Sequence, residues 1–182
     1  MTWRDIKGID AYELLDKLEM TEPPFNPFDI ARKIGVQVSQ EFDFDKLGTE
    51  GQISLVDNEP VIWVNPNKNE SRQRFTLAHE IGHLVNDILP EVDDPIIDEY
   101  QTLYRSDMYG GIETRANQFA ARLLMPLDSI EKYIDFLREK YPNIKAKEAI
   151  EATADKFEVS KQAVFHRFKN IGLIAKNYQY PF

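Results

Sequence analysis

Two histidines four residues apart, with a glutamate directly after the first, place the strongest constraint on how this chain of 182 residues can fold. They occur in the sequence His-Glu-Ile-Gly-His at residues 79–83. An α-helix has about 3.6 residues per turn, so His79 and His83 would project from one helix face toward a single metal ion. Glu80 would lie beside that face, where a carboxylate can act on water. The pattern therefore predicts a helix that carries a zinc hydrolase site.

An apolar stripe along the same segment gives the predicted helix a face toward the core. Its members recur every three or four positions: Leu77, Ile81, Leu84 and Ile88. The two histidines lie about opposite the stripe, whereas a histidine pair that only supports a core would lie within it. Gly82 costs about 1 kcal/mol relative to alanine in a helix interior, so we expect another backbone to approach it closely. The alternative is a chance His-Glu-x-x-His pattern on a solvated helix face, because such short patterns recur by chance.

A catalytic zinc ion needs three protein ligands and one open position for water. The chain has no cysteine and His166 is its only other histidine, so the remaining candidate donors are carboxylates. The best candidate is Glu113, at the start of a second helical run that Pro126 should end. Small alanines share a face with Glu113 and would let the two helices pack closely. Periodicity alone leaves another explanation open, in which Glu113 is an acidic first-turn residue favoured by the helix dipole.

A longer pattern joins these two segments. His-Glu-Ile-Gly-His is followed by Glu-x-x-Ala-Asn-x-Phe-Ala-Ala-x-Leu-Leu-Met-Pro, starting at Glu113. Together they resemble the ImmA/IrrE family of metallo-endopeptidases, over roughly residues 24–174. The resemblance implies one zinc ion held by His79, His83 and Glu113, with Glu80 as the catalytic base. It also implies regulation, because cutting a repressor protein switches genes on in that family.

Two further polar residues are candidates for orienting the metal ligands. Asn117 lies one helical turn after Glu113, and Asp87 lies one turn after His83. Residues that hydrogen-bond a metal ligand fix its orientation and increase its basicity. We expect Asn117 and Asp87 to act in this way.

The composition restricts the classes of partner. The formal net charge of −9 argues against broad affinity for nucleic acid. Residues 1–20 carry several acidic side chains and no long apolar run, so we expect neither a signal peptide nor a membrane span. The expected location is the cytoplasm. A protease there that is not a bulk degrader needs a specific client.

Local patterns predict an α+β fold of the zincin-like type, with the His-Glu-x-x-His helix in the core of a mainly helical body. We expect helices at residues 11–18 and after Asn26, with Gly35 just beyond the second. A strand at residues 36–42 and a hairpin of 52–56 with 61–64 predict a small antiparallel sheet. An acidic run at residues 91–99 is expected to be a solvated loop, and residues 100–111 could form a wall of the cleft.

After Pro126 the pattern predicts three more helices. Asp128 should cap the first, with Glu131 reaching back, and Ser160 should cap the last. The last two resemble a helix-turn-helix pair. Residues 144–176 hold seven Lys or Arg and four Asp or Glu, so this part is +3 and the remainder −12. This asymmetry permits DNA binding, but we favour a helical pair packed on the protease core, because the usual dense basic surface is lacking.

These inferences predict three parts and one function. Residues 1–22 form an N-terminal helical extension, 23–142 the zinc peptidase domain, and 143–182 the C-terminal helical segment. The expected function is a zinc endopeptidase that cleaves a specific repressor or toxin-system regulator. One rival is an anti-repressor or antitoxin-like protein that binds its client without cutting it. A second rival is a DNA-binding regulator that acts through residues 159–171.

Overall fold

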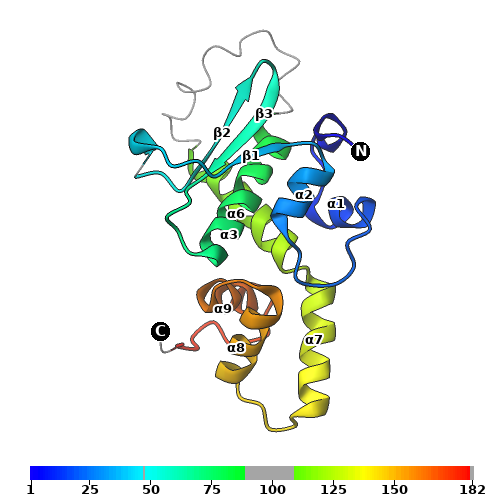
Figure 1. Cartoon of the computed structure of the whole chain (residues 1–182). Helices are drawn as coiled ribbons and strands as arrows, with labels where there is room; N and C mark the ends of the chain where they lie inside the picture. Colours follow the sequence, from blue (N-terminus) through cyan, green and yellow to red (C-terminus); the bar gives the residue numbers. More distant parts are fainter. Residues whose placement is uncertain (47, 89–108, 181–182) are drawn as a thin grey trace.

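Two helices packed side by side form the centre of the fold in the computed structural model, which describes residues 1–46, 48–88 and 109–180 (Figure 1). These helices are α3 (Glu70–His83) and α6 (Tyr109–Leu124), and they share more contacts than any other pair of described elements. Asn69 begins α3, because its side chain accepts a hydrogen bond of 2.9 Å from the backbone N–H of Arg72. A π-helical turn, η3 (Leu84–Ile88), continues α3 beyond its last histidine.

The packing of α3 on α6 explains the glycine in the motif. A Cβ atom added at Gly82 would lie 3.1 Å from the Cα atom of Ala116 and 3.2 Å from its carbonyl oxygen. These are backbone atoms of α6, which cannot rotate away as a flexible side chain can. The close backbone approach expected at Gly82 is therefore confirmed.

The sheet is mixed, so the expected antiparallel sheet is wrong. Its strands β1 (Gln37–Ser39), β2 (Gly51–Val56) and β3 (Glu59–Val64) run in the order β1-β3-β2, with β2 antiparallel and β1 parallel to β3. Asp57 and Asn58 both have positive φ, as a two-residue hairpin turn requires, and they fix the β2–β3 pairing. Alternation within β1 specifies neither its partner nor its direction, and its pairing with the other edge of β3 is set by tertiary packing.

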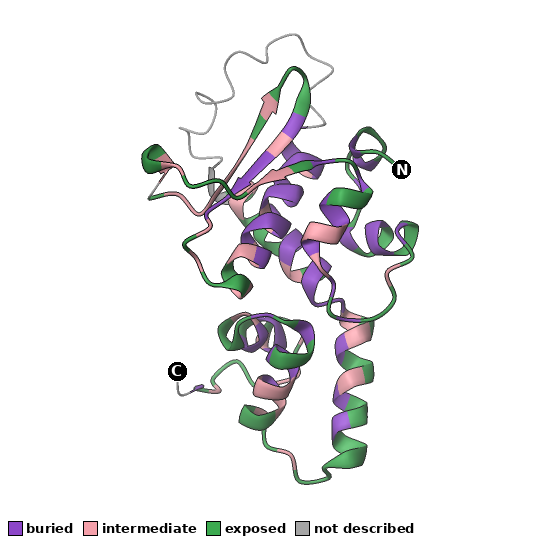
Figure 2. Ribbon diagram, in the orientation of Figure 1, coloured by how far each residue is buried: buried purple, intermediate pink, exposed green. Residues whose placement is uncertain are grey.

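The N-terminal helices lie beside α3 and α6 (Figure 1). A 3₁₀ turn, η1 (Trp3–Ile6), precedes α1 (Ala11–Lys17), which packs on α6, and α2 (Pro27–Lys33) packs on α3. Asn26 caps α2 as expected, by accepting a hydrogen bond of 3.0 Å from the backbone N–H of Phe28. Figure 2 shows that the inner faces of α2, α3 and α6 are buried.

The C-terminal part extends away from this body along α7 and returns toward it (Figure 1). The helices are α7 (Leu127–Lys140), α8 (Ala146–Phe157) and α9 (Lys161–Asn170). Ser160 caps α9 as expected, accepting a hydrogen bond of 3.1 Å from the backbone N–H of Ala163. The cap expected at Asp128 is wrong, because Pro126 holds the N-cap position and α7 begins at Leu127, so Asp128 lies in the first turn.

Two buried arginines link the returning helices to the body. Arg74 of α3 forms an ion pair of 2.8 Å with Glu158, in the turn between α8 and α9. Arg167 of α9 donates a hydrogen bond of 3.1 Å to the carbonyl oxygen of Met125, just after α6. The buried apolar side chains accordingly form one cluster that includes both Trp3 and Tyr180.

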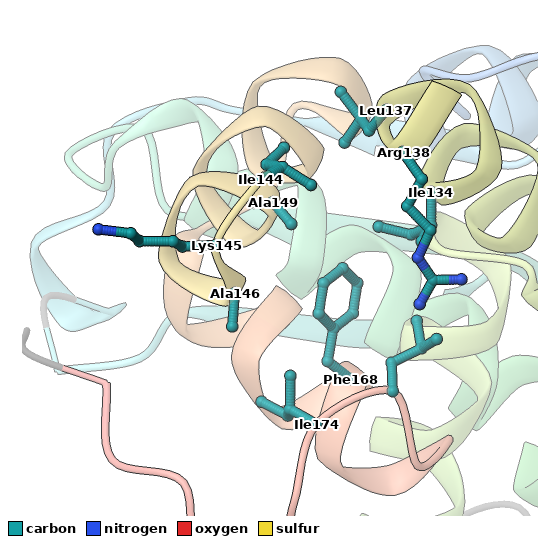
Figure 3. A pocket seen from close by; sticks show the side chains of 10 residues that line it. Ile134, Leu137, Arg138, Ile144, Lys145, Ala146, Ala149, Phe168 and Ile174 are labelled. Atoms are coloured by element: carbon teal, nitrogen blue, oxygen red, sulfur yellow. The ribbon is translucent and has the colours of Figure 1, made fainter. Parts of the chain in front are cut away.

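A hollow of about 190 Å³ lies among α7, α8 and the segment after α9 (Figure 3). Most of the residues that line it are apolar, Ile134, Ile144 and Phe168 among them, and Arg138 and Lys145 also line it. The helical pair α8–α9 thus has an apolar inner side. Its resemblance to a DNA-binding helix-turn-helix stays a prediction.

Two expectations concern segments at the limits of the description. Residues 91–99 and 100–108 lie outside the described residues, and the rest of the expected cleft wall, 109–111, is the beginning of α6. Among the helices that the structure describes, none has both the length and the apolar composition needed to cross a bilayer.

Replacing Gly82 or Gly111 by alanine should change the free energy of unfolding in opposite directions. Gly82→Ala should lower the free energy of unfolding by about 1–3 kcal/mol, because the new methyl group overpacks the contact with α6. Gly111→Ala is the control: apart from its chain neighbours and its own helix backbone, no described atom lies within 4 Å of the added Cβ, so this change should raise the free energy of unfolding by about 0.4–1 kcal/mol. Urea unfolding of the metal-free proteins measures both. Equal stabilisation by the two changes would contradict the close approach.

Candidate metal centre

The last turn of α3 and the N-terminal half of α6 bring together the three side chains proposed as metal ligands. The Nε2 atoms of His79 and His83 lie 2.9 Å apart. The two carboxylate oxygens of Glu113 face these nitrogens, with Oε2 3.3 Å from that of His79 and Oε1 3.3 Å from that of His83. One ligand atom from each residue thus falls within 4.8 Å of the others, and the structure describes no further residue in this group.

The spacing of these atoms suits a tetrahedral metal. Bonds of 2.0–2.1 Å from zinc to nitrogen or oxygen imply ligand atoms about 3.3 Å apart. The observed separations of 2.9–3.3 Å are close to that value. The rings of His79 and His83 are nearly perpendicular, at 85°, so their Nε2 atoms converge without stacking. Two imidazoles and a carboxylate are also a ligand set that catalytic zinc sites use.

Glu113 is not a first-turn residue. Helix α6 begins at Tyr109, so Glu113 lies one turn inside it, where the helix dipole gives a carboxylate less stabilisation. Ala116 and Ala120, on the neighbouring turns, are fully buried. The small alanines bring the α6 backbone close to α3, and this closeness brings the Glu113 carboxylate to the histidines.

Asn117 and Asp87, the two residues expected to orient the ligands, lie next to the Nδ1 atoms of the two histidines. The Nδ1 atom of His79 lies 3.1 Å from Asn117 Oδ1, and that of His83 lies 2.9 Å from Asp87 Oδ2. An oxygen acceptor at Nδ1 favours the tautomer that carries its proton there, so Nδ1 donates and the Nε2 lone pair faces the cluster. The π-helical turn η3 holds Asp87 at this position.

One contributor was missed by sequence reasoning. The side chain of Arg115 is 54% exposed, yet its Nη2 atom lies 2.7 Å from Asp87 Oδ1. Asp87 thus bridges Arg115 and His83. No sequence spacing signals this pair, because its members lie on elements separated by residues 89–108.

Charge and burial act differently on the groups of the site. Burial and the neighbouring His83 lower the pKa of His79. Burial also acts to lower the pKa of His83, but the hydrogen bond with Asp87 and the nearby carboxylates outweigh it and raise that pKa. Burial acts to raise the pKa of Asp87, but hydrogen bonds from His83 and Arg115 outweigh it, so that pKa is lowered.

Glu80 is the most perturbed carboxyl of the site. It is only 8% exposed, and burial raises its pKa to about 7, although a hydrogen bond from the backbone N–H of Ile53 acts in the opposite direction. Strand β2 lies directly against it: a Cβ atom added at Gly51 would overlap the Thr76 methyl group and lie 3.2 Å from Glu80 Oε1. A buried carboxylate that titrates near neutrality is suited to proton transfer.

The third histidine of the chain does not join the cluster. His166 lies on the exposed side of α9 and lines a cleft of about 1080 Å³ between α3, α6 and α9. Phe75 and Asn117, which also line this cleft, both contact His79. The cleft therefore begins beside the candidate metal centre.

The pKa of Glu80 predicts how stability depends on pH. The folded metal-free chain keeps the proton up to about pH 7, whereas the unfolded chain loses it near the ordinary value of 4.5, so the free energy of unfolding falls as the pH rises through this window. Glu80→Gln has no such proton to lose. Between pH 4.5 and 8, its free energy of unfolding should therefore rise by about 3 kcal/mol relative to that of the wild type. Urea unfolding of metal-free proteins across this range measures it. Glu70→Gln, on the exposed start of α3, is the control, and parallel curves for Glu80→Gln and wild type would contradict the burial effect.

Loss of the carboxylate behind His83 should weaken metal binding. Asp87→Ala should lower the affinity for zinc about 10- to 100-fold, because His83 loses the acceptor that fixes its tautomer. Competition with a chromophoric chelator measures this affinity. Asp29→Ala removes a carboxylate that pairs with Arg32 on the surface of α2 and should leave it unchanged. Equal zinc affinities of the two variants would show that Asp87 does not support metal binding.

Comparison with known proteins finds relatives of three kinds. The IrrE radiation response metalloproteases of Deinococcus deserti and Deinococcus radiodurans are 42% and 40% identical over 72 and 75 residues, which are 39% and 41% of this chain and 24% and 22% of theirs. Uncharacterized immunity region protein 2 of Bacillus phage phi105 is 35% identical over 72 residues, 40% of this chain and 42% of that protein. A Mycobacterium tuberculosis transcriptional regulator shares the fold, with a TM-score of 0.58 and 16% identity over 87% of this chain and 44% of that one.

The chain thus spans less than half the length of each of these relatives. A family model extends over more of it: the Peptidase M78 family, described as the IrrE N-terminal-like domain, matches residues 28–169. This match includes both helices of the candidate metal centre. The chain therefore belongs to the ImmA/IrrE family of metallopeptidases.

Proposed function

We propose that this chain is a zinc-dependent endopeptidase that cleaves a specific regulatory protein, such as a transcriptional repressor, and thereby relieves repression. The observation that carries the proposal is the convergence of His79, His83 and Glu113 beside a buried carboxyl, Glu80. A site that only held a structural metal would not need this buried acid. Zinc fits better than calcium or magnesium, since two of the three donors are imidazoles.

The proposed reaction is hydrolysis of one peptide bond. Zinc bound by His79, His83 and Glu113 would supply a Lewis acid and lower the pKa of a bound water toward neutrality. Glu80 accepts the proton of the attacking water as its oxygen bonds to the carbonyl carbon. Glu80 then gives this proton to the leaving amine as the carbon–nitrogen bond breaks. Asn117 and Asp87 keep the two imidazoles oriented through their Nδ1 atoms.

The sheet supports an extended substrate. Strand β2 pairs only with β3 among the described strands, so its other edge is available to add a strand of the client through main-chain hydrogen bonds. Glu80 contacts β2 at the backbone of Ile53 and close to Gly51. We propose that the architecture is zincin-like and that the scissile segment lies along this edge.

The relatives support a regulatory client. Two carry the name of a radiation response metalloprotease and one that of a phage immunity region protein. A repressor or a toxin-system regulator is the class of client that these names favour, and it would place the chain in the cytoplasm. We further propose that residues 23–142 form the peptidase unit, that 1–22 extend it, and that 143–182 pack on it as a wall of the cleft.

Conservative variants separate cleavage from metal binding. Glu80→Gln should lower cleavage of a regulator encoded beside this chain at least 100-fold, because no base takes the proton of water, while zinc stays bound at one ion per chain. His79→Ala, His83→Ala and Glu113→Ala should each lose the zinc. Fragment analysis by mass spectrometry and metal analysis measure the two effects.

The exposed Glu70→Gln is the matched control and should cleave normally. If wild type and Glu80→Gln relieve repression equally and release no fragments, the chain acts by binding its client, and the protease proposal is wrong. Stoichiometric zinc in Glu113→Ala would exclude Glu113 as the third ligand.

A further inference from the structure

The cleft between α3, α6 and α9 is continuous with the candidate metal centre. Asn117 lines it and contacts His79, and Met125 lines it just beyond the end of α6. Asn117, Ala121 and Met125 follow one another at intervals of four residues and all line the cleft, so the cleft runs from the candidate metal centre toward Met125. At 1.5 Å per residue, Met125 is about 18 Å from Glu113 along the axis. An extended peptide of about five residues covers this distance.

The walls of this cleft are basic in a chain that is acidic overall. Three arginines and His166 line it, and no aspartate or glutamate is among its lining residues. Arg72 pairs with Glu50, and Arg122 makes a looser pair of 3.5 Å with Asp10. The third, Arg167, differs from both because it is buried, at 9% exposed.

Arg167 has no carboxylate partner in the described part of the chain. Its Nε atom donates a hydrogen bond of 3.1 Å to the carbonyl oxygen of Met125, and its Nη2 atom donates one of 3.1 Å to the Tyr12 hydroxyl group. Both acceptors are neutral, and its Nη1 atom donates to no described acceptor. Arg74, the other buried arginine, has the carboxylate of Glu158 at 2.8 Å. Buried charges are normally paired with a charge of opposite sign. Arg167 is therefore a buried, oriented cation without an anionic partner among the described residues.

We propose that this cleft binds an acidic segment of the protein client and that Arg167 holds one of its carboxylates about five residues from the cleaved bond. A guanidinium oriented by two hydrogen bonds presents its remaining donors in a fixed direction, which suits a carboxylate. Arg72 and Arg122, at the surface of the same cleft, add attraction for neighbouring acids. The position of the cleaved bond rests on the proposed function, whereas the binding of the acidic segment does not.

A peptide carboxylate fits this site better than nucleic acid. The cleft presents one buried cation and two that already pair with acids, and the chain has a net charge of −9. A phosphate backbone needs many neutralising contacts in a row. The cleft also begins beside His79 and the cluster around Glu80, where a peptide bond would have to lie.

Binding is tested with zinc-loaded Glu80→Gln, so that no cleavage intervenes. Fluorescein-labelled hexaglutamate should bind at least ten times more tightly than labelled hexaglutamine in anisotropy titrations at low salt. Arg167→Met should remove most of this difference, about a ten-fold loss, and Arg167→Lys, which keeps the charge, should lose less. Arg138→Met is the matched control, since it removes an arginine on α7 that lies outside this cleft, and it should bind as the parent does.

The exposed pair Arg72→Gln and Arg122→Gln covers the case in which Arg167→Met fails to fold. The double variant should weaken hexaglutamate binding about three- to five-fold. Equal binding of hexaglutamate and hexaglutamine, or equal effects of Arg167→Met and Arg138→Met, would overturn the inference. Tighter binding of labelled hexathymidylate than of hexaglutamate would overturn it in favour of nucleic acid.

A second experiment locates the acid relative to the cut. Wild type is incubated with a proteome-derived peptide library, and the cleaved bonds are identified by mass spectrometry. Aspartate and glutamate should be enriched four to six residues from the cut on one side, and Arg167→Met should lose this enrichment. Cleavage without enrichment would refute the inference and leave the protease intact, whereas hexaglutamate binding without any cleavage would refute only the protease.

Discussion

The contact between Gly82 and Ala116 is the constraint on which the rest of this structure depends. It lets the backbones of α3 and α6 approach so closely that a methyl group at position 82 would lie 3.1 Å from the Cα atom of Ala116, tighter than an ordinary contact. Glu113 precedes Ala116 by one turn, and His79 and His83 flank Gly82, so the same approach sets the separation of the three candidate ligands. The glycine of the motif thus has a geometric role, although it contributes no side chain to the chemistry.

The site concentrates negative charge inside an apolar body. Glu80 and Asp87 are buried, and Glu113 is close to both histidines, while Arg115 is the cation that pairs with Asp87. Removing carboxylates from water is costly unless a cation or hydrogen-bond donors compensate. The raised pKa of Glu80 is the sign of this cost in the metal-free chain. A divalent cation at the cluster would compensate the charge and favour the ionised form that a base requires.

Sequence patterns predicted what local chemistry decides. The caps at Asn26 and Ser160, the hairpin of residues 52–56 with 61–64 and the glycine contact at Gly82 follow from short segments, and the structure confirms each of them. Glu113 was different, because periodicity could not separate a ligand from a first-turn acid. The longer family pattern favoured the ligand, and the start of α6 excludes the first-turn explanation.

Tertiary packing decided the features that no pattern predicted. The parallel pairing of β1, the bridge from Arg115 to Asp87 and the environment of Arg167 each join segments distant in the sequence. The cap expected at Asp128 failed for a local reason, since Pro126 both ends one helix and begins the next. Helix periodicity and residue preference do not predict which distant residues will come into contact.

The coordination of the metal itself tests the central claim most directly. X-ray absorption at the zinc edge, on the purified chain loaded with one equivalent of zinc at neutral pH, reports the number and kind of bound atoms. The account predicts two imidazole nitrogens and one or two oxygens at about 2.0–2.2 Å. A shell of six oxygens without imidazole, or a chain that takes up no zinc under these conditions, would contradict it.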